Sequence, residues 1–198
     1  MSAHNIEVQG GSTVRLPTAG KYCDRDIVVT ATGGASGENK LAQVIDQSVT
    51  EITASDLQGA TKIGYYKFNS CSSLVSAEIP VGVTSISTQA FGSCSKLTNV
   101  SLPEGLTTIG GNAFERCKFS IIAIPSTVTS ISSWAFGYCS KLETVTIRAT
   151  TPPTVYTNTF SNSTALSKII VPDGCGDAYK AATNWSAYAD IIVEESAV

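Results

Sequence analysis

From Val83 the chain reads V-T-S-I-S-T-Q-A-F-G-S-C-S-K-L-T-N-V-S-L-P, and two later stretches repeat this pattern. They are L-T-T-I-G-G-N-A-F-E-R-C from Leu106 and V-T-S-I-S-S-W-A-F-G-Y-C-S-K-L-E-T-V-T-I from Val128. Five phenylalanines, 23, 23, 22 and 24 residues apart, mark one position of the repeat: Phe68, Phe91, Phe114, Phe136 and Phe160. A cysteine follows four of them at the third residue: Cys71, Cys94, Cys117 and Cys139. A repeat of this length predicts a solenoid of stacked coils.

Each repeat unit contains two runs of apolar residues that point inward. Val100 and Leu102 alternate with polar residues, which predicts a half-buried strand that Pro103 ends. A second run, on an irregular return path, consists of Leu106, Ile109, Ala113, Phe114 and Cys117. A coil of about 23 residues cannot bury both runs alone, so we expect the coils to stack about 4.8 Å apart with like residues in ladders.

The pattern A-F-x-x-C-x-x-L-x-x-V-x-L/I-P, followed by V/L-T-x-I, resembles the BspA-type leucine-rich repeats of bacterial surface and secreted proteins. The resemblance covers Ile63 to Pro172, and V-P-D-G-C-G-D-A-Y-K-A-A-T-N-W from Val171 is similar to the closing segment of that family. It implies a leucine-rich-repeat solenoid of about five coils. It also implies an extracellular or cell-surface protein that adheres to or recognises a host protein or glycan.

Four local departures from the repeat pattern are visible. One residue is missing after Cys117, so Phe119 stands where Leu97 stands in the preceding copy. The other three departures are substitutions. Arg148 replaces the proline that ends the strand, Ser163 replaces the last ladder cysteine, and Lys67 replaces the first alanine of the Ala-Phe pair. Repeats at the ends of a solenoid commonly depart from the pattern in this way, because they act as capping units.

Residues 1–34 lack the repeat and predict a small β-meander. Apolar and polar residues alternate in three runs, around residues 6–8, 14–16 and 27–31. Residues 12–32, which include L-P-T-A-G-K-Y-C-D-R-D-I-V-V-T-A-T, are also weakly similar to short β-modules of prophage tail proteins. About 34 residues rarely hold a core alone, so we expect this attachment module to dock on another surface. That surface could be a second copy of the chain, which would give a homo-oligomer through residues 1–34.

The remaining chain divides by composition into a linker, a lid, the coils and a cap. Residues 35–40 are a flexible linker, and residues 41–198 form the solenoid. Residues 41–62 predict a lid whose short turn Ser55 or Asp56 caps. Residues 173–198 predict a C-terminal cap with a short helix at 177–183 and a strand at 191–193. The aromatic residues of this cap, Trp185 and Tyr188, either seal the open end of the core or bind a ligand, and we favour the seal.

The charge and hydropathy of the chain argue against nucleic acid and membrane partners. Thirteen basic and sixteen acidic residues give a net charge of −3, and residues 81–147 carry four of the former and three of the latter. We expect no membrane insertion, because no long apolar run is present. Met1 is followed by the polar Ser-Ala-His-Asn. If Met1 is the natural start there is no ordinary signal peptide; otherwise the sequence leaves room for one that has been removed.

The residues needed for metal binding or catalysis are not arranged for either. The chain has one histidine, His4, and no C-x2-C or C-x-H pair, so we expect no metal and no cofactor. The ladder cysteines are interpreted as small buried fillers, although neighbouring coils could bring two of them within disulfide distance. Glu104, Glu115 and Glu143 occupy different positions of the repeat, and no nucleophile has a base nearby. The sequence therefore predicts a protein that is not an enzyme.

Two exposed surfaces are candidates for binding. The strand face presents two outward columns: Ser76, Asn99, Ile121, Thr144 and Lys168, and Glu78, Ser101, Ala123, Thr146 and Ile170. The return path presents Tyr66 and Trp134 two residues before the ladder phenylalanine, and Arg116 and Tyr138 two residues after it. These aromatic rings either stack on a sugar or protein partner or simply cover apolar neighbours. The chain is thus predicted to be a binding and adhesion module, with a structural spacer in a prophage tail or surface assembly as the alternative.

Overall fold

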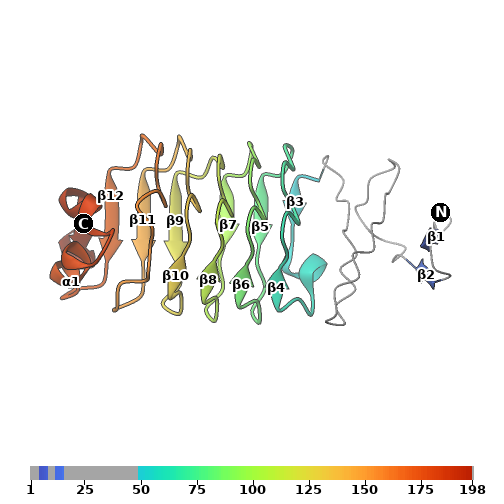
Figure 1. Ribbon diagram of the computed structural model, residues 1–198, viewed down its shortest axis with the longest axis horizontal. Helices are drawn as coiled ribbons and strands as arrows, with labels where there is room; N and C mark the ends of the chain where they lie inside the picture. Colours follow the sequence, from blue (N-terminus) through green and yellow to red (C-terminus); the bar gives the residue numbers. More distant parts are fainter. Residues whose placement is uncertain (1–4, 9–11, 16–48, 198) are drawn as a thin grey trace. The chain divides into compact units, whose positions relative to one another are not determined.

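The computed structural model describes residues 5–8, 12–15 and 49–197 (Figure 1). The chain divides into two units, Met1–Asp46 and Gln47–Val198. In the first unit, β1 (Asn5–Val8) pairs antiparallel with β2 (Ser12–Arg15). The expected strand run at residues 27–31, the linker at 35–40, and residues 41–48 of the lid lie outside the described residues.

The second unit is a solenoid in which each coil places a strand shortly after the leucine position of the repeat (Figure 1). These strands form two parallel sheets. The first contains β3 (Glu51–Ile52), β5 (Ser76–Glu78) and β7 (Asn99–Ser101). The second contains β9 (Ile121–Ile124), β11 (Thr144–Ile147), β12 (Lys168–Val171) and β13 (Ile192–Glu194). The predicted leucine-rich-repeat architecture is confirmed.

The return path is more regular than the sequence suggested. It contains a third parallel sheet of two-residue strands: β4 (Lys62–Ile63), β6 (Ser85–Ile86), β8 (Thr108–Ile109) and β10 (Ser130–Ile131). The V/L-T-x-I motif supplies these strands, because its buried isoleucine and exposed threonine repeat at the same height in each coil. The Thr107 N–H, for example, donates to the Thr84 carbonyl of the preceding coil at 2.8 Å.

The first two sheets are separated where the repeat loses a residue. Among the described strands, no ladder joins β7 to β9. Just before β9, in the shortened turn after Cys117, the Lys118 N–H still donates to the Leu97 carbonyl of the preceding coil at 2.8 Å. Phe119 takes the place of a leucine, is fully buried, and lies edge-on to Phe114 and Phe136 with ring centroids 6.1 and 6.2 Å apart. The larger ring fills the core where the coil is shorter.

The ladder phenylalanines form one continuous stack along the core. Successive ring centroids from Phe68 to Phe160 are 4.9, 5.3, 5.6 and 5.6 Å apart, and the planes of neighbouring rings differ by 16° or less. The backbone is bonded from coil to coil at the same position. The backbone N–H of each of the first four ladder phenylalanines donates to a carbonyl of the next coil at 2.7–3.0 Å. All five rings are at most 3% exposed. The stack is therefore the shared core of every coil.

In the described part of the predicted lid, β3 is followed by a short 3-10 helix, η1 (Ala54–Leu57). The expectation that Ser55 or Asp56 caps this turn is wrong in its position, because Thr53 is the N-cap. The Asp56 carboxylate instead accepts a hydrogen bond from the Thr53 N–H at 2.8 Å, the reciprocal half of a capping box. The buried apolar residues of this segment are Val49, Ile52 and Leu57.

The C-terminal residues cover the last coil. They comprise α1 (Gly176–Ala181), the 3-10 helix η2 (Ser186–Ile191), β13, and the 3-10 turn η3 (Glu195–Ala197). The helix ends two residues earlier than predicted, and the strand begins one residue later. The Trp185 indole N–H donates to the Pro153 carbonyl and the Tyr179 hydroxyl to the Ala149 carbonyl, at 2.7 and 2.6 Å. Both side chains are buried, and these bonds to backbone carbonyls satisfy their polar atoms in the absence of solvent contact.

Replacement of Phe114 by alanine tests the importance of the stack. The substitution removes a ring that contacts Phe91, Phe136 and Phe119, so we expect a loss of about 3–5 kcal/mol in the free energy of unfolding. Chemical denaturation measures this loss. Phe119→Leu should also destabilise the protein, but less than Phe114→Ala, because leucine keeps part of the buried volume that the ring fills in the shorter coil. A Phe114→Ala protein that melts within about 2 °C of the parent would contradict the stack.

Candidate binding surface

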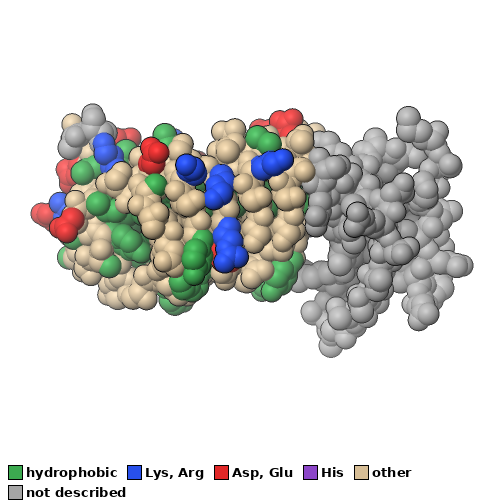
Figure 2. Space-filling model, turned by 90° about the horizontal axis from the view of Figure 1, so that it is seen from above, with side chains coloured by type: hydrophobic (Ala, Val, Ile, Leu, Met, Phe, Trp, Pro, Cys, Tyr) green, Lys and Arg blue, Asp and Glu red, His purple; other side chains and the backbone are tan. Residues whose placement is uncertain are grey.

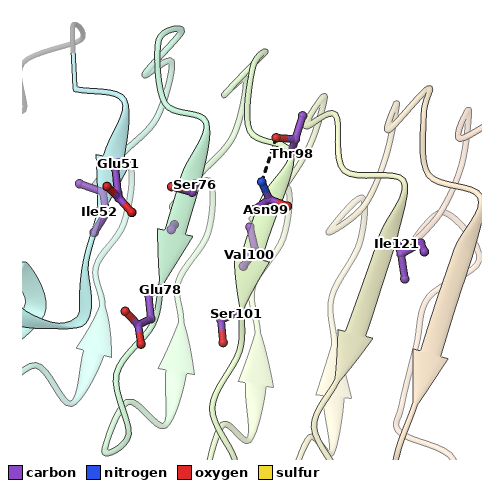
Figure 3. A pocket seen from close by; sticks show the side chains of 10 residues that line it. Glu51, Ile52, Ser76, Glu78, Thr98, Asn99, Val100, Ser101 and Ile121 are labelled. Atoms are coloured by element: carbon purple, nitrogen blue, oxygen red, sulfur yellow. Dashed lines mark hydrogen bonds between the residues drawn. The ribbon is translucent and has the colours of Figure 1, made fainter.

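The strand face carries a shallow depression at its N-terminal end. It has a volume of about 390 Å³ and is lined by residues of β3, β5, β7 and β9, including Glu51, Glu78, Asn99 and Ile121 (Figure 3). The register places Asn99 beside Ser76, whereas Ile121 lies beyond the gap between the sheets. Its polar lining is mostly short Ser, Thr and Asn side chains, and Ile121 is 63% exposed. The surface offers hydrogen bonds and little enclosure.

The other predicted strand-face residues continue the same column beyond this depression. Thr144 lies between Ile121 and Lys168 in the sheet register, and both Thr144 and Lys168 are half-buried. The columns expected from the sequence are therefore present within each sheet. Glu51 also belongs to this column, one coil before Ser76, and sequence reasoning missed it because the repeat is unrecognisable there.

The predicted return-path residues Trp134, Tyr138 and Arg116 come together as an aromatic cluster. The rings of Trp134 and Tyr138 stack with centroids 5.5 Å apart and planes 11° apart. The Arg116 guanidinium carbon lies 5.0 Å from the centre of the Tyr138 ring, within cation–π distance. Tyr138 is 40% exposed, the Arg116 side chain is 57% exposed, and Trp134 is half-buried. Tyr66 lies three coils away and is not part of this cluster.

The backbone of the turn around each ladder phenylalanine explains how these side chains are presented. The residue two before the phenylalanine is left-handed in four coils: Tyr66, Gln89, Asn112 and Trp134, with φ of 55–59°. The residue two after it is also left-handed in the same coils: Ser70, Ser93, Arg116 and Tyr138, with φ of 57–62°. Asparagine tolerates this conformation, whereas a bulky side chain pays about 1 kcal/mol for it. Trp134, Tyr138 and Arg116 therefore occupy strained positions, where other coils have Tyr66, Gln89 or Asn112 before the phenylalanine and Ser70 or Ser93 after it.

The charge of Arg116 is balanced by its neighbour. A Glu115 carboxylate oxygen lies 3.7 Å from the Arg116 Nε, and Glu115 is only 16% exposed. The Asn112 amide N–H donates to the other oxygen of Glu115 at 2.9 Å. The cluster thus presents aromatic faces and amide groups with little net charge. Figure 2 shows several Lys and Arg side chains near one another over the middle of the face in view, and Asp and Glu side chains mostly toward its ends.

The repeat region matches the model of the BspA-type leucine-rich repeat region in six copies over residues 61–186. The chain belongs to this family. A leucine-rich cell-surface protein from Faecalibacterium prausnitzii A2-165 is 30% identical, with a TM-score of 0.55, over 71% of this chain and 34% of that one. The T. pallidum leucine-rich repeat protein TpLRR is 25% identical, with a TM-score of 0.57, over 62% of this chain and 59% of that one.

The pneumococcal vaccine antigen PcpA shares the fold at 21% identity, with a TM-score of 0.54, over 78% of this chain and 46% of that one. This chain therefore spans between about a third and three fifths of these structures. No curated protein shows significant similarity to it.

The cysteines of the BspA-type repeats are thiols that donate hydrogen bonds across coils. The Sγ atoms of Cys94, Cys117 and Cys139 lie 3.0–3.4 Å from the carbonyl oxygens of Phe68, Phe91 and Phe114. Ser163, in the same column, makes the equivalent bond to Phe136 at 2.7 Å. The ladder cysteines are therefore not purely apolar fillers. No disulfide is present among the cysteines that the structure describes.

Burial makes these thiols unreactive. Desolvation, with a smaller contribution from a neighbouring cysteine, raises the pKa of Cys94 to about 12, and desolvation raises the pKa of Cys139 to about 12. The same two causes raise the pKa of Cys117 well above its usual value. A thiol with such a pKa forms almost no thiolate at neutral pH.

Nothing in the described residues points to a metal centre or a membrane span. Residues 5–8, 12–15 and 49–197 contain no group of three or more potential metal ligands. Within the same ranges, no helix combines the length and hydrophobicity that crossing a bilayer requires.

Thiol labelling tests the buried ladder. At pH 8 a thiol reagent should leave Cys94, Cys117 and Cys139 unmodified in the native protein and modify all three after denaturation, because attack requires both thiolate and access. Mass spectrometry of peptides measures the sites. Cys175, which is partly exposed, is the internal comparison and should react faster. Rapid native modification of any ladder cysteine would show that its coil is wrongly placed.

Proposed function

We propose that the chain is a non-enzymatic recognition module that binds a protein or glycan through its repeat surface. The observation that carries this proposal is the aromatic cluster of Trp134, Tyr138 and Arg116. Three bulky side chains occupy left-handed positions that other coils fill with Tyr66 or with Gln, Asn or Ser, and these three come together in a partly exposed cluster. Strained residues persist where they serve a purpose, and exposed Trp, Tyr and Arg are the side chains most often central to binding.

The chemistry of the described residues supports binding rather than catalysis. The ladder thiols are buried with raised pKa values, and their S–H groups point at carbonyl oxygens rather than at a base. Glu115, the carboxylate nearest to the cluster, is paired with Arg116. The balanced charge also argues against a nucleic-acid footprint. Similarity to a cell-surface protein supports a location outside the cell.

The alternative function is a rigid spacer in a surface or phage-tail assembly. In that case residues 1–34 would join copies of the chain, and the repeats would bind no ligand. The continuous phenylalanine stack would give such a spacer its stiffness. We favour recognition because stiffness does not require strained aromatic side chains on the turn.

Binding of the full chain to arrays of extracellular-matrix proteins and glycans tests the proposal. We expect at least one ligand that the parent binds and that a Trp134→Asn/Tyr138→Ser double variant binds at least tenfold more weakly. Asn and Ser already occupy these positions in other coils, so the variant should keep its fold. Ile121→Ser, an exposed change on the strand face, is the matched control and should bind like the parent.

Two results would contradict the proposal. Loss of binding in Ile121→Ser alone would move the site to the strand face. Absence of any ligand, together with self-association that is lost when residues 1–40 are removed, would favour the spacer.

A further inference from the structure

We infer that the column Tyr66, Gln89, Asn112 and Trp134 binds a linear, uncharged oligosaccharide that lies along the solenoid axis. This inference rests on the proposed function and specifies its ligand. The four residues occupy one position in four successive coils and share one left-handed backbone conformation. The directions in which their side chains leave the backbone are therefore similar. Together they form a straight row, with an aromatic ring at each end and two amides between.

The row is held at a fixed spacing by backbone hydrogen bonds. The N–H groups of Tyr66, Gln89 and Asn112 donate to carbonyls of the next coil at 3.2, 2.9 and 3.0 Å. With coils about 4.8 Å apart, three steps separate Tyr66 from Trp134 by about 14 Å. Tyr66 is 58% exposed, and the other three residues are half-buried. A ligand that touches both rings must therefore be extended and several units long.

The two amides between the rings have hydrogen-bonding capacity left over. The Gln89 side-chain oxygen accepts from the Asn69 amide at 3.3 Å, and the Asn112 amide donates to Glu115. Each amide group offers two donor hydrogens and an acceptor oxygen. Within the described residues, neither amide makes a further side-chain hydrogen bond, so its remaining N–H and C=O capacity is available to a ligand. Hydroxyl groups, which both donate and accept, suit such a row.

The chemistry of the row favours a neutral sugar chain over the other candidates. Tyrosine and tryptophan faces pack against the C–H groups of a pyranose ring, while amides bind its hydroxyls. An anionic chain would need uncompensated cations, yet Arg116, the cation beside Trp134 and Tyr138, is paired with Glu115. A protein interface usually buries about 800 Å² on each side around an apolar centre. Along the row, Tyr66 and the Trp134–Tyr138 stack stand about 14 Å apart with two amides between them, so no continuous apolar centre of that size is present.

Titration of the full chain with neutral oligosaccharides tests the inference. Cellohexaose and chitohexaose are the probes, their mono- to pentasaccharides give a length series, and hexagalacturonate is the anionic comparison. Binding is followed by calorimetry and by tryptophan fluorescence, in which Trp134 responds and the buried Trp185 does not. We expect affinity to rise with length until the chain spans about 14 Å, and hexagalacturonate to bind at least tenfold more weakly.

Variants locate the site. Trp134→Asn and Tyr66→Asn should each weaken hexasaccharide binding at least tenfold, with melting temperatures close to the parent because Asn112 occupies the same position. Tyr156→Ser is the matched control, since Tyr156 is 48% exposed but lies outside the row. Tyr66→Asn should leave the weak binding of a monosaccharide to Trp134 unchanged.

Three outcomes overturn the inference: no neutral oligosaccharide binds, hexagalacturonate binds better than the neutral chains, or the two asparagine variants bind like the parent. Failure of the inference is distinguishable from failure of the proposed function. If a protein ligand still requires Trp134 and Tyr138, only the sugar is excluded. If no ligand of any kind requires them, the proposed function also fails.

Discussion

The structure depends on the stacking of one coil on the next through its phenylalanines. A single coil can bury neither its apolar side chains nor its backbone polar groups, so its stability comes from its neighbours. The phenylalanine rings, the thiol-to-carbonyl bonds and the backbone N–H groups on both sides of each ring all repeat at the same step. A change in the length of one coil interrupts one of these ladders while the others continue. After the missing residue no ladder joins β7 to β9, yet Phe114 still stacks on Phe136 and β8 still pairs with β10.

The same stacking determines what the surface can present. The chain reverses tightly around the buried phenylalanines, and at four of the five it does so with left-handed residues two positions before and two after. Because these coils repeat the turn, outward side chains at these positions form straight rows. Asparagine tolerates the left-handed conformation at such a position at little cost. A Trp, Tyr or Arg there trades stability for an exposed side chain of defined direction.

The repeated motif was sufficient to predict the solenoid, the phenylalanine ladder and the strand-face columns, because identical residues at fixed spacing must stack. Phe119 could also be assigned to the leucine column, since a deletion shifts the count by one. The short strands of the return path were missed because two residues give no periodicity. The pairing of Trp134 with Tyr138 and of Arg116 with Glu115 was beyond the sequence, because it depends on the left-handed turn, whose usual glycine signal is absent here.

Native-state hydrogen exchange of the amides of Phe91, Phe114 and Phe136 tests the coil-to-coil stacking most directly. Each of these N–H groups donates to the next coil, at 2.8–3.0 Å, beside a fully buried ring. If stacking supports the fold, the three amides should be among the slowest to exchange and should share one opening free energy, equal to that of global unfolding. Fast exchange of any of them, or separate opening free energies for the three, would contradict the account.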